Sequence, residues 1–125
     1  MENTRIEQLE ALETLIEFNS RLLRNLPTII SELSGNRQED TENYLKTIID
    51  AINWELSVIN STLDVLNDGE VRLNKESFNE KVMALNSALS AQSDPETATA
   101  LRDLVPCFEQ LDKAAREVTN RVEGE

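Results

Sequence analysis

The chain has no histidine, one cysteine, three glycines, three prolines and few aromatic residues. Without histidine it lacks the commonest general base and the imidazole ligands of zinc and di-iron sites. The single cysteine, Cys107, cannot form a disulfide within the chain, and there is neither a CxxC motif nor a glycine-rich phosphate-binding loop. We therefore expect no enzymatic activity, no cofactor and no bound metal.

Positive charge is also scarce, since 24 acidic residues face 12 basic ones and the net charge is −12. Such a charge repels nucleic acid and anionic membrane surfaces. No apolar run approaches the ~20 residues of a membrane-spanning helix, and Met1 is followed by a charged segment rather than by the apolar core of a signal peptide. We expect a cytoplasmic protein that binds no nucleic acid and does not insert into a membrane. The acidity favours solubility, or else attraction to a basic partner.

The residues that are abundant, leucine, glutamate, asparagine and alanine, favour packed helices. Apolar periodicity and capping residues predict four helices, over residues 3–33, 41–68, 75–92 and 94 to nearly the end. Asn74 is the expected cap of the third helix and Asp94 that of the fourth. Short connections make successive helices antiparallel. The sequence therefore predicts an all-α protein, one domain over residues 1–125, folded as an up-down-up-down four-helix bundle with unequal helices.

Two prolines fall inside these helices, Pro27 in the first and Pro106 in the fourth. Proline lacks an amide hydrogen and crowds the carbonyl four residues back, so we expect a kink in both helices. The third helix is the shortest and carries one narrow line of apolar residues. We expect it to lie at the edge of the bundle and to leave part of the other helices uncovered.

The second helix has two apolar stripes. The first, called the aliphatic stripe, is expected to form the core and comprises Leu45, Ile49, Ile52, Leu56, Ile59, Leu63 and Leu66. The other, called the Trp54 stripe, lies roughly half a turn away at about 100° per residue. It comprises Tyr44, Ala51, Trp54, Val58 and Val65.

The Trp54 stripe is the best functional clue in the sequence. The aliphatic stripe is sufficient to fill the interior, and large exposed aromatic patches are uncommon on proteins that act alone. We therefore expect Tyr44, Trp54, Val58 and Val65 to bind a protein partner, most simply a second copy in a homodimer. The alternative is that the first or fourth helix covers this stripe within one chain.

Three further residues could carry chemistry. Asn19 projects into the apolar sector of the first helix, where we interpret it as a hydrogen-bonded core residue that fixes register. Glu55 lies in the gap between the two stripes and is expected to reach the surface or to pair with an arginine, although a buried carboxylate with a raised pKa would be an acid or base. Cys107 has no basic neighbour in sequence and is expected to be a small core residue.

The runs LPTIISELSGN, YLKTIIDAINWELSVINSTLDVL and LRDLVPCFEQL resemble a small uncharacterised family of bacterial helical-bundle proteins. The most recognisable piece is IIDAINW, residues 48–54, where family members tend to carry glycine in place of Ala51 and keep the tryptophan. The resemblance implies no activity or cofactor. In size, acidity and helical layout the chain is also similar to flagellar export chaperones, which is an analogy of fold.

Two classes of function follow from these features. The first is a non-enzymatic interaction module, namely a homo-oligomer, an adaptor or a chaperone-like protein, which binds through the Trp54 stripe. The second is a small-molecule sensor or an enzyme with a site inside the bundle, for which Glu55 and Asn19 would be the polar anchors. The unequal helices and the two-sided second helix favour the first class.

Overall fold

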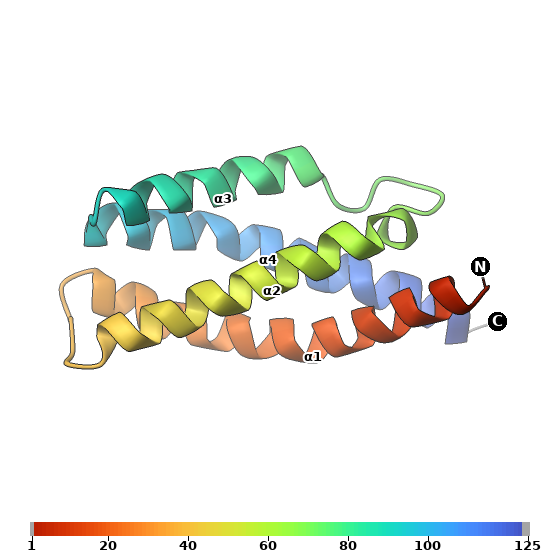
Figure 1. Ribbon diagram of the computed structural model, residues 1–125, viewed down its shortest axis with the longest axis horizontal. Coiled ribbons are helices and arrows are strands. Elements are labelled where there is room, and N and C mark those ends of the chain that lie inside the picture. Colours follow the sequence, from red (N-terminus) through yellow and green to blue (C-terminus); the bar gives the residue numbers. More distant parts are fainter. Residues whose placement is uncertain (1, 124–125) are drawn as a thin grey trace.

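Four α-helices, each antiparallel to the one before it, form the protein (Figure 1). This computed structural model describes the backbone of residues 2–123 and the side chains of residues 6–120. The helices are α1 (Glu2–Leu33), α2 (Thr41–Leu66), α3 (Lys75–Ser90) and α4 (Asp94–Glu123). The predicted all-α, up-down-up-down four-helix bundle with unequal helices is confirmed.

Local capping explains where α3 and α4 begin. The Asn74 side chain accepts a hydrogen bond from the amide of Ser77 at 3.0 Å, so Asn74 caps α3 as its sequence position predicts. At α4 the prediction was wrong in detail, because the hydroxyl of Ser93 accepts from the Glu96 amide at 3.3 Å. Asp94, the expected cap, belongs to the helix and binds an arginine of another segment instead.

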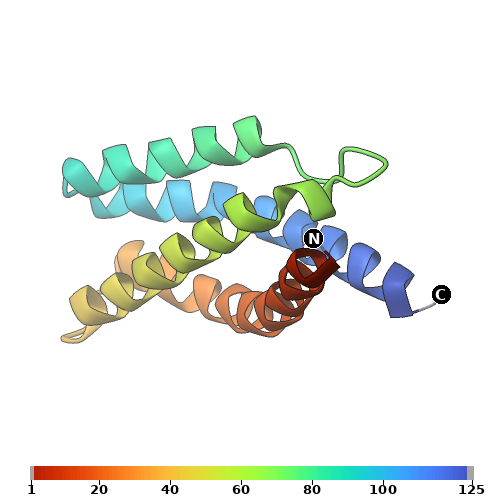
Figure 2. The same ribbon diagram turned by 45° about the vertical axis from the view of Figure 1, so that its right-hand side comes forward.

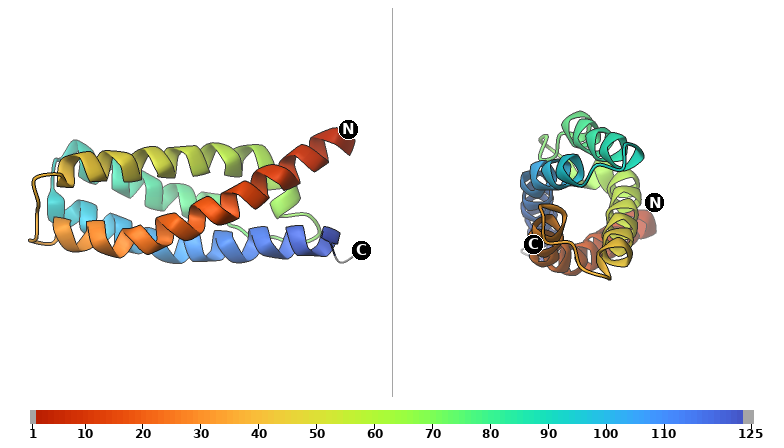
Figure 3. Two further views of the ribbon diagram at one scale, coloured as in Figure 1. Left: turned by 90° about the horizontal axis from the view of Figure 1, so that it is seen from below. Right: turned by 90° about the vertical axis from the view of Figure 1, so that its left-hand side faces the viewer.

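Both internal prolines lie within continuous helices, Pro27 in α1 and Pro106 in α4. Neither proline therefore divides its helix. Figure 2 and Figure 3 show α1 bending along its length, so that its N-terminal part leads away from the line of its C-terminal part. This bend agrees with the kink predicted for α1.

The helices do not pack equally against one another. α1 packs along both α2 and α4, α3 packs along α4, and α2 approaches α4 only briefly. No Cα atom of α2 comes within 8 Å of a Cα atom of α3, although the two helices follow each other in the chain. The end-on view in Figure 3 shows α1 and α3 at opposite corners of the bundle. As predicted, α3 is an edge helix. The principal neighbour of α2 is α1.

The face that α2 buries differs from the predicted one. Four residues of the aliphatic stripe are buried, whereas Ile49, Leu56 and Leu63 are only partly buried. The inward positions between them are Ile48, Glu55 and Thr62, of which Glu55 and Thr62 have no exposed surface. The physical reason is that α1 lies on the Glu55 side of α2, while α3 stands away from the opposite side.

Candidate functional site

Most of the Trp54 stripe is covered within the single chain, and α1 contacts the stripe at Trp54 and Tyr44. Val58 is 8% exposed and Val65 is 3% exposed, so both belong to the core of the single chain. Tyr44 is half-buried, whereas Trp54 is 39% exposed. The expectation that this stripe would lie uncovered is therefore wrong for Val58 and Val65. Trp54 is the member of the stripe with a substantial free surface.

An aromatic pair marks the outer edge of the contact between α1 and α2. The rings of Phe18 and Trp54 lie with their centroids 4.7 Å apart and their planes at 50°. Farther along, the hydroxyl of Tyr44 donates a hydrogen bond to the carbonyl oxygen of Asn25 at 3.3 Å. Phe18 contacts the Trp54 ring, and 39% of the Trp54 surface remains exposed. A supported, part-exposed tryptophan is typical of an anchor residue in a protein contact.

Two polar residues of the interior, Asn19 and Glu55, come directly after the two members of this aromatic pair in the sequence. Asn19 follows Phe18 on α1 and Glu55 follows Trp54 on α2, so the two residues lie at the same level of the antiparallel helices. Both are 0% exposed. The amide nitrogen of Asn19 donates to the carbonyl oxygen of Phe108 on α4 at 2.8 Å, which confirms that Asn19 is a hydrogen-bonded core residue. Its amide oxygen has no partner.

Glu55 is not the surface or arginine-paired residue that the sequence led us to expect. Both of its carboxylate oxygens are buried without a hydrogen-bond partner. Burial is the cause that raises the pKa of this carboxyl group to about 8, since the charged form loses its water. At neutral pH Glu55 is therefore mostly protonated. Apolar periodicity could not reveal this, because Glu55 falls between two apolar stripes and either side of α2 could have faced solvent.

Cys107 is half-buried on α4. Burial raises the pKa of its thiol, although the positive charge of Lys81 opposes that effect. A thiol with a raised pKa is a poor nucleophile at neutral pH. Within the described side chains, no group of three histidine, cysteine, aspartate or glutamate residues could hold a metal ion.

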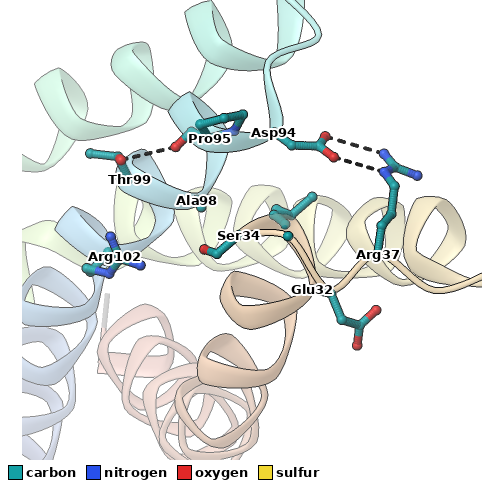
Figure 4. A pocket seen from close by; sticks show the side chains of 10 residues that line it. Glu32, Ser34, Arg37, Asp94, Pro95, Ala98, Thr99 and Arg102 are labelled. Atoms are coloured by element: carbon teal, nitrogen blue, oxygen red, sulfur yellow. Dashed lines mark hydrogen bonds and ion pairs between the residues drawn. The ribbon is translucent and has the colours of Figure 1, made fainter.

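A pocket of about 670 Å³ opens at the end of the bundle where α1 finishes and α4 begins (Figure 4). Its apolar lining is formed by Leu33, Pro95 and Ala98, while Arg37 and Arg102 contribute positive charge. Arg37 is occupied, because its Nε lies 2.9 Å from the Asp94 carboxylate and its Nη2 lies 2.9 Å from Glu42. These two bonds, that to Asp94 first, raise the pKa of the Arg37 guanidinium. Arg37 thus joins the first loop to α2 and α4, which is a structural role.

The chain belongs to a family described as a domain of unknown function (DUF8042), whose sequence model matches residues 10–114. The resemblance to an uncharacterised family is thereby confirmed. No curated protein and no solved structure matches the chain, so the analogy to flagellar export chaperones stays a prediction. No helix within residues 2–123 is both long enough and apolar enough to cross a membrane.

Proposed function

We propose that this protein is a non-enzymatic interaction module of the cytoplasm, acting as a homodimer or as a chaperone-like adaptor, and that its contact surface is centred on Trp54. One observation carries this proposal, namely that the only tryptophan of the chain is 39% exposed while it rests on Phe18. Tryptophan is the residue type most enriched at the energetic centres of interfaces. A ring that is already supported within its own chain loses little freedom on binding.

The surroundings of Trp54 suit a contact of moderate size. Ala51, one turn before it, is half-buried, and Ser57 and Ser61 are exposed with hydroxyls that donate to carbonyl oxygens of their own helix. Small side chains whose donors are already satisfied let another surface approach closely at little desolvation cost. The net charge of −12 would disfavour self-association through an acidic face, but Trp54 and these neighbours are uncharged.

The experiment is a charge substitution at the anchor. The variant Trp54→Glu should remain helical but sediment as a monomer under conditions in which the wild type forms dimers, because an unpaired charge is costly in a dry interface. The matched control is Met83→Glu on α3, which changes an equally apolar and more exposed residue, 67% against 39%, on another helix. Equal sedimentation of wild type and Trp54→Glu, with the wild type dimeric, would remove Trp54 from the contact.

A small-molecule site inside the bundle is the second candidate. Glu55 and Asn19 are both fully buried, and three of their oxygen atoms lack partners. The pocket of Figure 4, however, is lined by neither residue. We therefore keep this candidate second. Stabilisation of the wild type, but not of Glu55→Gln, by a small amine such as methylammonium would favour it.

A further inference from the structure

Burial without a hydrogen-bond partner sets Glu55 apart from the other charged residues. Among residues 6–120 it is the one ionisable residue with no exposed surface, whereas the Arg72 side chain, 6% exposed, is paired with Glu70 and Glu117. The buried residues of α1 are apolar apart from Asn19, and those of α4 are apolar apart from two threonines. On α1, the charged residues nearest in sequence to Asn19 are Glu17 and Arg21, and both are exposed. On α4 the half-buried thiol of Cys107 lies near Lys81 of α3. No counter-charge therefore faces Glu55 when it ionises.

The helix that carries Glu55 has only one extensive neighbour. α2 packs extensively against α1 alone, and it has no close backbone contact with α3. Its ends are tied by polar contacts. At its start Thr41 donates to Glu32 at 2.7 Å, and just beyond its end Arg72 donates to the Leu66 carbonyl at 3.1 Å. Between these ties, at the level of Glu55, α1 carries Phe18, which pairs with Trp54, and the uncharged Asn19.

The contact of α1 with α4 differs from its contact with α2. Asn19 binds the backbone of Phe108, so at this level α1 is held to α4 by a hydrogen bond that does not involve α2. An ionised carboxylate cannot remain in an apolar interior without a partner and must reach water. Because α1 and α4 are joined here, α2 is the helix that can move.

We propose that ionisation of Glu55 separates the middle of α2 from α1, and that this opening exposes Val58 and Val65 beside Trp54. Three observations support this proposal. Both carboxylate oxygens of Glu55 lack partners, Glu55 is fully buried, and α2 packs extensively against one helix alone. Opening would complete the stripe that the sequence marks as a binding surface. That consequence rests on the proposed function, whereas the opening itself does not.

The pKa of about 8 makes the step accessible near neutral pH. At pH 7 about one molecule in ten carries the ionised group, and at pH 9 about nine in ten do. The pKa of Tyr44, the other titrating group on this side of α2, is raised by burial and by the charge of Glu32. Tyr44 therefore stays neutral over this range and does not quench Trp54 as a tyrosinate.

The test uses the fluorescence of Trp54, the only tryptophan of the chain, as the reporter of the opening. Between pH 6.5 and 9 the wild type should show a red shift of the emission and a rise of at least twofold in the acrylamide quenching constant, while the far-UV helical signal stays constant. Glu55→Gln and Glu55→Leu should keep the acid-form quenching throughout. The control Glu17→Gln, an exposed acid beside Phe18, should titrate like the wild type.

Three results would overturn the proposal: no change in quenching of the wild type, the same change in Glu55→Gln, or a change that coincides with loss of helix. The outcome is separable from that of the proposed function. Sedimentation of Trp54→Glu at pH 6.5 tests the contact surface with the bundle closed, and quenching of the isolated chain tests the opening without any partner.

Discussion

Glu55 shows how a single residue can be placed correctly by periodicity and still be misjudged. The sequence locates it between two apolar stripes of α2, and the structure agrees. Its environment depends on which side α1 occupies, and that is a property of the packed bundle. Asn19, in contrast, lies at the centre of one broad apolar sector, so its burial could be predicted. Its hydrogen-bond partner, the Phe108 carbonyl, lies on another helix, so this bond could not be predicted.

Glu55 should make the stability of the protein depend on pH. The pKa is raised from 4.5 in the unfolded chain to about 8 in the fold, so between these values the folded state retains a proton that the unfolded state has released. The free energy of unfolding should therefore fall as pH rises through this window, by up to about 1.4 kcal/mol per pH unit.

Urea unfolding of the wild type and of Glu55→Gln over a pH series would measure this effect. The two proteins should differ least near pH 4.5, and the variant should gain on the wild type up to pH 8 and no further. A constant difference across the series would mean that the carboxyl group of Glu55 titrates normally and is not buried as described.

At the scale of the helix, sequence periodicity predicted the extent of α2 well. The inward face that it predicted, however, is turned about the helix axis relative to the observed one. A helix with apolar residues on two sides has no single apolar direction. Its apolar pattern alone therefore does not show on which sides the neighbouring helices pack. The error is confined to Ile49, Leu56 and Leu63, which lie toward the side where α3 stands away from α2. The cap at Asn74 was predicted correctly, because it depends on contacts within a few residues, whereas at α4 Ser93 takes the place expected for Asp94.

A pair of alanine substitutions on α2 distinguishes the two faces. Ile52 is 1% exposed, so Ile52→Ala should lower the free energy of unfolding by roughly 2–5 kcal/mol. Leu56 is only partly buried, and Leu56→Ala should cost distinctly less. Denaturant melts of both variants at one pH provide the comparison, and a larger loss for Leu56→Ala would restore the face predicted from the sequence.

For the whole molecule, the number, order and direction of the helices followed from apolar periodicity, turn residues and short connections. The sequence did not predict which helices would be close neighbours. The simplest bundle places α2 beside α3, yet α1 serves as the main neighbour of α2 and α3 packs on α4. The narrow apolar line of α3 suits one groove, and this explains in retrospect why one helix suffices to hold it. That same arrangement buries Val58 and Val65 under α1 and leaves Trp54 at the surface.

The central claim is that the Trp54 surface is a protein contact, and its homodimer form is tested most directly by the accessibility of Trp54 itself. Acrylamide quenching should be measured at pH 6.5 over a dilution series in which sedimentation gives the fraction of dimer. The account predicts that quenching of the 39%-exposed ring falls in proportion to that fraction. A dimer that forms while quenching stays constant, or a wild type that remains monomeric at every concentration, would contradict it.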